Sequence, residues 1–167
     1  MENAQQVILD VAKEFGRKFG PEYGLFESYR LEDADVGVIA ANSTAGTTKF
    51  VVDALREQGV KAGMLKLRLF RPFPAKEIAE ALGHLKALAV MDRAISFGAM
   101  DNAGPLYLEL LAALTVHGVQ MPVANYVYGL GGRDILPSEI ERVYRDMLTS
   151  GETGQVEQRV TYLSVRE

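Results

Sequence analysis

The chain has 167 residues, of which 48% are hydrophobic and 24% charged, and this is the composition of a globular domain of ordinary size. The formal net charge of −4 does not favour a nucleic-acid partner, and a sequence without cysteine has no disulfides, iron–sulfur ligands or thiol nucleophile. No apolar run approaches the roughly 18 residues of a membrane-spanning helix, and the N-terminus is too charged for a secretory signal. We therefore expect a cytoplasmic protein with no nucleic-acid or membrane partner.

The first residues predict a helix followed by a linker. Apolar residues recur at helical spacing over residues 3–19, which is typical of an amphipathic helix. Gly20 and Pro21 then break the pattern. We expect residues 1–24 to form an N-terminal helix and the remnant of a linker, ahead of the main domain.

From residue 36 onward, short buried strands alternate with helices. The expected strands are 36–41, 61–70, 86–92 and 122–129. The expected helices are about 44–58, 74–83, 105–117 and 138–148. This alternation predicts an α/β fold, a three-layer sandwich around a mostly parallel sheet, with its main domain over 25–150. Ser138 and Glu141 have the spacing of a capping box, and the tail, 151–167, could add an edge strand.

Charged residues and glycines follow these strands where their carboxyl ends meet at one edge of a parallel sheet. Arginines and aspartates follow the second, third and fourth strands, and three glycines stand in GLGG after the fourth. Glycines packed this tightly allow unusual φ angles or the close approach of another group to the backbone. The candidate docking or ion-pair edge consists of Arg71, Asp92, Arg93, Gly129, Gly131, Gly132, Arg133 and Asp134.

Three interpretations of this edge stay open from the residues alone. Its side chains can form ion pairs and caps that tie loops together, or a polar docking surface, for which arginine is well suited. They can also bind a phosphate or nucleotide, since STAGTT at a helix start offers backbone N–H groups to an anion. The nucleotide interpretation is weak, because a Rossmann fingerprint follows the first strand and has a glycine where Asp134 stands here.

The sequence contains no self-contained active site. His84 and His117 each stand at a predicted helix end, where an imidazole can bond terminal carbonyls, so they are more consistent with caps than with metal ligands. Ser96 lies outside any GxSxG elbow, and no paired carboxylates stand out for acid–base work. We therefore assign no catalytic, cofactor-binding or metal-binding residue to this chain.

Three motifs, in order, carry a resemblance to a known family: LRLFRPFP, then DRAISFG, then GLGGRD. With their surroundings, over about residues 25–148, they resemble the C-terminal half of the alpha subunit of pyruvate:ferredoxin oxidoreductase. That half is similar to the C-terminal domain of transketolase. The resemblance implies a five-stranded sheet with one antiparallel edge strand. Residues 1–24 resemble the linker after the preceding domain of such subunits.

What the resemblance implies about activity is an enzyme complex of anaerobic metabolism. Such complexes oxidatively decarboxylate a 2-oxoacid on thiamine diphosphate, pass electrons through iron–sulfur clusters to ferredoxin, and transfer the acyl group to coenzyme A. The preceding thiamine-pyrimidine-binding domain is missing from this sequence. Thiamine diphosphate, Mg and the iron–sulfur clusters are therefore expected elsewhere in the complex, with none on this chain. The implied partners are thiamine-binding beta, gamma and ferredoxin-like delta subunits.

For this chain the resemblance implies a structural, subunit-docking domain that is inactive in isolation. The alternative from a different class is an independent α/β module that binds a small anion or nucleotide at the carboxyl edge of the strands. A docking domain is expected to expose an apolar or mixed patch where its neighbour is missing. Such a patch is compatible with self-association into a homodimer.

Overall fold

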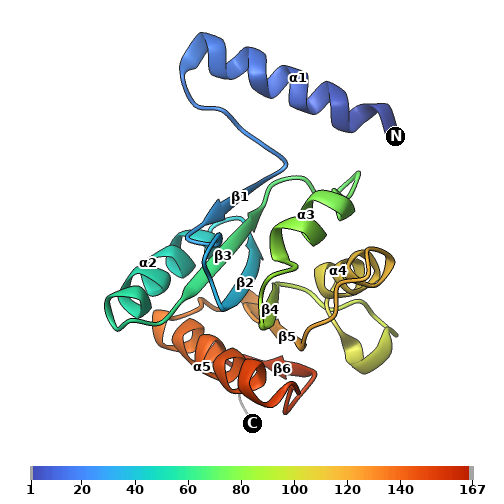
Figure 1. The fold of residues 1–167 in the computed structure, drawn as a ribbon. Helices are drawn as coiled ribbons and strands as arrows, with labels where there is room; N and C mark the ends of the chain where they lie inside the picture. Colours follow the sequence, from blue (N-terminus) through green and yellow to red (C-terminus); the bar gives the residue numbers. More distant parts are fainter. Residues whose placement is uncertain (1, 166–167) are drawn as a thin grey trace.

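The computed structural model describes residues 2–165, which form a sheet covered by helices on both faces and one further helix that stands apart (Figure 1). The strands are β1 (Phe26–Tyr29), β2 (Val36–Ala41), β3 (Ala62–Leu67), β4 (Ala87–Asp92), β5 (Val123–Val127) and β6 (Val160–Tyr162). The helices are α1 (Glu2–Phe19), α2 (Thr44–Glu57), α3 (Ala75–Leu82), α4 (Pro105–Val116) and α5 (Pro137–Thr153). Short 3-10 turns cover Met100–Asn102 and Leu130–Gly132.

The strands lie side by side in the order β1-β3-β2-β4-β5-β6. β2 is parallel to β3 and β4, β4 is parallel to β5, and β5 is parallel to β6, whereas β1 runs antiparallel to β3. The expected α/β fold with a mostly parallel sheet and one antiparallel edge strand is confirmed. The sheet has six strands rather than five, because β6 pairs with β5 at the edge opposite β1.

Helices cover the two faces of the sheet in pairs. α2 and α5 pack together on one face, and α3 and α4 pack together on the other (Figure 1). Successive side chains of a strand point to opposite faces. Val38 of β2 therefore belongs to the same buried cluster as Tyr144 of α5, while its neighbour Ile39 belongs to the opposite cluster with Leu110 of α4. Full burial of an apolar side chain is worth about 1.5–3 kcal/mol, so both layers contribute to stability.

The last helix differs from its expected boundaries. α5 begins at Pro137, whose fixed φ suits a first helical turn, and the Glu139 carboxylate accepts a hydrogen bond at 2.8 Å from the backbone N–H three residues earlier. The expected capping box at Ser138 and Glu141 is therefore wrong. The helix also runs past the expected end at 148, and Gly154 terminates it with a left-handed φ of 72°.

The first helix has a different relation to the sheet. α1 lies above the rest of the molecule and is joined to it by the extended segment 20–24 (Figure 1). Its side chain Gln5 donates a hydrogen bond to Glu77 of α3 at 2.8 Å. Within residues 2–165, no helix is both long and apolar enough to span a membrane.

Candidate functional site

The sheet changes its winding direction between β2 and β4. The chain reaches β3 from β2 through α2 on one face, and then crosses back to β4 through α3 on the other face. In open α/β sheets the loops diverge at such a point and leave a crevice at the carboxyl ends of the strands. A cavity of about 480 Å³ lies there, with Ser43, Arg68, Arg93 and Tyr128 among its lining residues.

A smaller hollow of about 280 Å³ adjoins this cavity and shares part of its lining. The linings of the two hollows together contain four of the predicted edge residues. Asp92 and Arg93 line the larger, and Arg93, Arg133 and Asp134 line the smaller. Arg71 lines neither hollow, so the structure separates it from the rest of the set.

Asp92, at the end of β4, is buried and caps the start of α4. Its Oδ1 accepts a hydrogen bond from the Leu106 N–H at 2.9 Å, and its Oδ2 accepts one from the Tyr107 N–H at 3.1 Å. These are two of the N–H groups that a helix start leaves without an intrahelical partner. Burial raises the pKa of Asp92, and the hydrogen bonds from both N–H groups oppose that shift.

Asn125 completes this buried network, and the sequence reasoning did not single it out. Its Nδ2 donates to Asp92 Oδ2 and to the Val90 carbonyl, both at 3.0 Å, and its Oδ1 accepts from the Gly104 N–H at 2.8 Å. Only a glycine fits at 104, because a Cβ there would lie 2.1 Å from the Asp92 Cγ. The sequence signal that could have identified Asn125 is its amide side chain inside the otherwise apolar and aromatic run PVANYVYG.

The glycine turn after β5 shows why three glycines stand together. Gly129, Gly131 and Gly132 have φ angles of 68°, 70° and 79°, in the left-handed region that L side chains disfavour by about 1–2 kcal/mol. At Gly129 a Cβ would also lie 2.8 Å from the Nε of Arg93. The group that approaches the backbone here is therefore an arginine side chain from the loop after β4.

The two charged residues after the glycine turn do not pair with each other. Arg133 donates a hydrogen bond to the carbonyl oxygen of Ser164, which ties the turn to the end of the described chain. Neither Arg93 nor Asp134 has an ion-pair partner among residues 2–165. The edge therefore presents a guanidinium and a carboxylate that the described fold does not neutralise through direct ion pairs.

Arg71 has a different role from the other arginines of the predicted edge. Its guanidinium forms an ion pair with Glu109 of α4 at 2.7 Å and lies 4.3 Å from the centre of the Phe70 ring. The residue is about half exposed, so the pair contributes modestly to stability. Arg71 connects the loop after β3 to α4.

The start of α2 offers little to a bound anion. The N–H groups of Ala45 and Gly46 donate to the Asn42 and Ser43 carbonyls at 3.4 and 2.9 Å. The Thr44 hydroxyl shares a hydrogen bond of 2.7 Å with the Tyr128 hydroxyl. These contacts occupy donors that a phosphate would need at a helix N-terminus.

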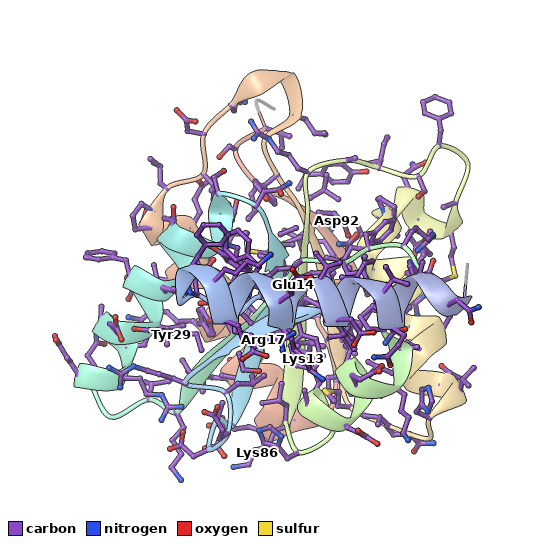
Figure 2. All side chains as sticks on the ribbon, turned by 90° about the horizontal axis from the view of Figure 1, so that it is seen from above. Lys13, Glu14, Arg17, Tyr29, Lys86 and Asp92 are labelled. Atoms are coloured by element: carbon purple, nitrogen blue, oxygen red, sulfur yellow. The ribbon has the colours of Figure 1, made fainter. Side chains whose placement is uncertain are left out.

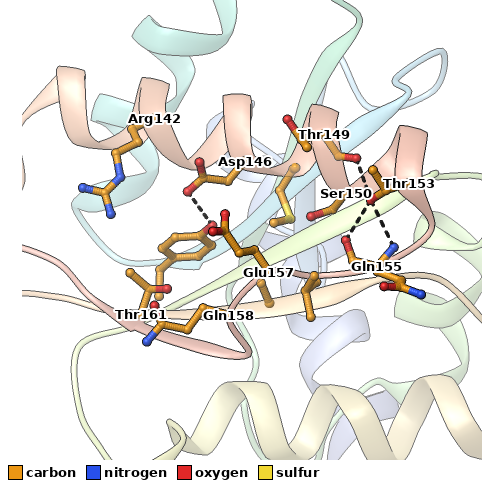
Figure 3. A pocket seen from close by; sticks show the side chains of 13 residues that line it. Arg142, Asp146, Thr149, Ser150, Thr153, Gln155, Glu157, Gln158 and Thr161 are labelled. Carbon is orange, nitrogen blue, oxygen red and sulfur yellow. Dashed lines mark hydrogen bonds between the residues drawn. The ribbon is translucent and has the colours of Figure 1, made fainter.

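A larger cavity, of about 840 Å³, lies away from the strand-end edge, between the second half of α5 and residues 155–161 (Figure 3). Within it the Tyr126 hydroxyl donates to Asp146 at 2.9 Å, and burial keeps the pKa of Tyr126 far above its ordinary value. Hydroxyl groups of Thr149, Ser150 and Thr153 line its α5 side. Its lining contains no histidine, cysteine or lysine, and its two carboxylates are Asp146, which accepts the bond from Tyr126, and Glu157.

Histidine does not provide a metal site in the described part of the chain. The sequence suggested that His84 bonds the carbonyls at the end of the preceding helix. Instead, its Nε2 lies 2.8 Å from the Leu31 carbonyl, in the connector before β2. Within residues 2–165, no group of three or more histidine, aspartate or glutamate side chains is arranged to hold a metal ion.

Comparison with known proteins decides the family. The pyruvate:ferredoxin oxidoreductase core domain II matches residues 34–140, which is well over half of the chain. The chain belongs to this family. The resemblance inferred from the motifs LRLFRPFP, DRAISFG and GLGGRD is thereby confirmed.

Relatives of this core domain II chain are subunits of several oxidoreductases. It is 45% identical over its full length to the pyruvate synthase subunit PorA of Thermotoga maritima, of which it covers 41%. It is 39% identical over 99% of its length to the ketoisovalerate oxidoreductase subunit VorA of Pyrococcus abyssi, again covering 41%. The alpha subunit of the NADH-dependent phenylglyoxylate dehydrogenase of Aromatoleum evansii is 42% identical over 86% of this chain and 34% of that subunit. The chain thus spans about two fifths, or less, of the length of these relatives.

A solved structure shows the same fold. The 2-oxoglutarate:ferredoxin oxidoreductase from Magnetococcus marinus, with 2-oxoglutarate, coenzyme A and succinyl-CoA bound, matches with a TM-score of 0.59. The match covers 81% of this chain and 21% of that chain at 20% sequence identity. At this identity the likeness concerns the fold, and it agrees with the family assignment of core domain II.

Proposed function

We propose that this chain is a structural, subunit-docking domain of a 2-oxoacid:ferredoxin oxidoreductase, the type of complex that oxidatively decarboxylates a 2-oxoacid to acyl-CoA and reduces ferredoxin. Family membership supports the complex, since the relatives are pyruvate synthase and ketoisovalerate oxidoreductase subunits. The observation that supports docking rather than catalysis is the state of the buried strand-end groups. The Asp92 carboxylate and the Thr44 hydroxyl are held by hydrogen bonds within the fold.

The cofactors of the reaction are proposed to lie on other parts of the complex. Iron–sulfur clusters need cysteine thiolates, and the sequence contains none. The Mg²⁺ that accompanies thiamine diphosphate takes oxygen ligands, and residues 2–165 hold no group of carboxylates arranged for a metal. The side chains of this chain therefore do not fit these groups, and thiamine-binding beta, gamma and ferredoxin-like delta subunits are the proposed partners.

The exposed charges at the sheet edge are proposed to face one of these partners. Arg93 and Asp134 lack ion-pair partners among residues 2–165, and both line the smaller hollow. Rim charges of this kind set the register and the association rate of an interface. The function of the edge is then recognition, with Asp92, Arg71 and the glycine turn holding its shape.

Reconstitution tests the proposal. The tagged chain is co-produced with the beta, gamma and delta subunits and with the remaining part of the alpha subunit. We expect equimolar recovery and 2-oxoacid- and coenzyme A-dependent reduction of ferredoxin, with no such activity from the chain alone. An active complex that forms from the other components without this chain would refute the docking role.

A charge reversal at the edge tests the surface itself. Arg93→Glu is expected to lower recovery of the complex by about tenfold or more, because a hydrogen bond to a charged group is worth about 1.5–3 kcal/mol and about 1.4 kcal/mol is a tenfold change in affinity. Arg145→Glu is the matched control, since Arg145 is exposed on α5 and pairs only within its own helix. Equal recovery of the complex with both variants would show that the edge does not take part in the interface.

The second candidate is an independent module that binds a small anion or nucleotide. The cavity at the winding switch, with Arg68 and Arg93 on its lining, is the observation that favours it. A module of this kind gains about 2.7 kcal/mol of stability at a ligand concentration 100 times Kd. Thermal unfolding with thiamine diphosphate, coenzyme A and ATP at 1 mM separates the candidates, since the docking domain is expected to show no shift with any of them.

A further inference from the structure

The first helix carries a row of exposed apolar side chains. Val7, Val11, Phe15 and Phe19 recur every four residues, a spacing that places them along one side of a helix. Their exposed fractions are 58%, 59%, 41% and 66%. We call these four residues the apolar stripe. A stripe of this kind on a surface helix normally faces a core, and here it faces outward.

α1 rests on the body of the protein through a different side. Leu9, Ala12 and Gly16 are half-buried, and Gln5 of the same side bonds Glu77 of α3 at 2.8 Å. In Figure 2, where the molecule is seen from above, α1 crosses in front of the sheet with Lys13, Glu14 and Arg17 along it. The helix therefore contacts the body on the side of Gln5 and leaves the apolar stripe uncovered.

The apolar stripe continues into the strand-end edge. The Phe15 ring lies 4.7 Å from the Phe19 ring and 5.7 Å from the Tyr23 ring, measured between centroids. The Arg68 guanidinium lies 4.9 Å from the centre of the Tyr23 ring, and Arg68 also lines the cavity at the winding switch. One surface thus runs from α1 through Tyr23 to the carboxyl ends of the strands.

The size of the apolar stripe decides which partner it suits. An 18-residue helix is about 27 Å long and about 10 Å wide, so one side of it offers about 270 Å². A stable complex between free chains buries about 800 Å² on each partner, which is well above this area. A second copy bound through the stripe alone would therefore associate weakly. A partner in the same polypeptide needs less area, because its effective concentration is in the millimolar range.

The relatives possess such a partner. About three fifths of the length of the Thermotoga maritima subunit has no counterpart in this chain. We propose that the apolar stripe of α1 is the docking surface for that remaining part of the alpha subunit, which would cover it with an apolar groove. This inference rests on the proposed docking function, and it names the surface and the partner.

A joined subunit tests this inference. The part of the Thermotoga maritima subunit that lacks a counterpart here is joined ahead of Met1, and three versions are compared by thermal unfolding and by proteolysis of the linker 20–24. The first has the natural helix. The second carries Val11→Asp and Phe15→Asp. The third, the matched control, carries Asn3→Asp and Gln6→Asp, which add the same charge at exposed polar positions of the same helix.

With the natural helix we expect one cooperative transition and slow cleavage of the linker, and the control should behave alike. The stripe variant is expected to unfold in two transitions, with cleavage at least tenfold faster. Independent unfolding with the natural helix, or identical behaviour of all three versions, would overturn the inference. Reconstitution with the beta, gamma and delta subunits would still decide the docking function separately. A dimer of the isolated chain that the stripe variant abolishes would assign the stripe to a second copy and also overturn it.

Discussion

Asp92 stabilises the fold through hydrogen bonds to neutral donors. Its carboxylate accepts from two N–H groups at the start of α4 and from the side-chain amide of Asn125. A carboxylate in this position also interacts favourably with the positive end of the helix dipole. Since the donors surround both oxygens, Asp92 fixes the approach of α4 to β4 and β5.

Replacing this carboxylate tests its structural role. Asp92→Ala is expected to lower the free energy of unfolding by about 2–3 kcal/mol, because it removes the side chain that caps the start of α4 and leaves the buried Asn125 amide with one partner fewer. Urea denaturation followed by circular dichroism measures the change. Asp134→Ala, at an exposed position, should stay within about 0.5 kcal/mol of the natural protein. Similar losses in both variants would contradict the capping role.

Residue patterns in the sequence predict where the residues of this edge lie better than they predict which residues these contact. Asp92 and Arg93, which follow each other at the end of β4, line one cavity. The partners of Asp92 stand 14, 15 and 33 residues away, and no local spacing indicates which helix start it meets. Arg71 was grouped with the edge because it follows a strand, but its loop continues far enough to meet Glu109.

At the scale of elements, β1 depends on charge pairs as well as on its ladder. It is a four-residue edge strand, and Glu27 in its centre pairs with Lys49 of α2 and with Arg68 just after β3. These contacts hold the antiparallel edge to both neighbours. The hydrogen bond from the Lys49 ammonium keeps the pKa of Glu27 below its ordinary value of 4.5, and Arg68 acts in the same direction.

This pKa shift makes part of the stability dependent on pH. A carboxyl with a lowered folded-state pKa contributes stability that is present above its unfolded pKa, near 4.5, and is lost as the pH falls through the folded pKa. Glu27→Gln is therefore expected to cost up to about 1 kcal/mol at pH 7, since the pair is partly exposed. The difference from the natural protein should close as the pH is lowered from 5 to 3. Urea denaturation across this range measures it, and a constant difference would exclude the pair as its cause.

Element boundaries were predictable where apolar runs meet turn residues, and less so elsewhere. The run VGVIAA gave β2 its observed limits, Val36 and Ala41. β3 was expected to reach residue 70 but ends at Leu67. The following backbone N–H groups turn to the Leu25 carbonyl, a contact set by the antiparallel β1 far earlier in the chain. Tertiary contacts of this kind cannot be inferred from a local pattern.

At the scale of the whole molecule, the described chain consists of a layered body and a helix with few contacts to it. Both faces of the sheet are covered by their own helices, and each layer has a core of fully buried side chains. α1 adds one interelement hydrogen bond through Gln5 and an aromatic cluster around Tyr23. The body therefore has what an independently folding domain needs, without α1.

Removal of the helix tests this division. A chain that begins at Gly20 is expected to keep its cooperative unfolding, with a melting temperature within about 2–4 °C of the full chain, the shift that corresponds to about 1 kcal/mol at this size. The reason is that α1 leaves the apolar stripe exposed and contributes no residue to either buried cluster, so its removal uncovers little of the core. Differential scanning calorimetry of both chains measures the shift. A fall of 10 °C or more would show that α1 belongs to the core of the body. It would thereby contradict the inference that the apolar stripe is a docking surface for another part of the subunit.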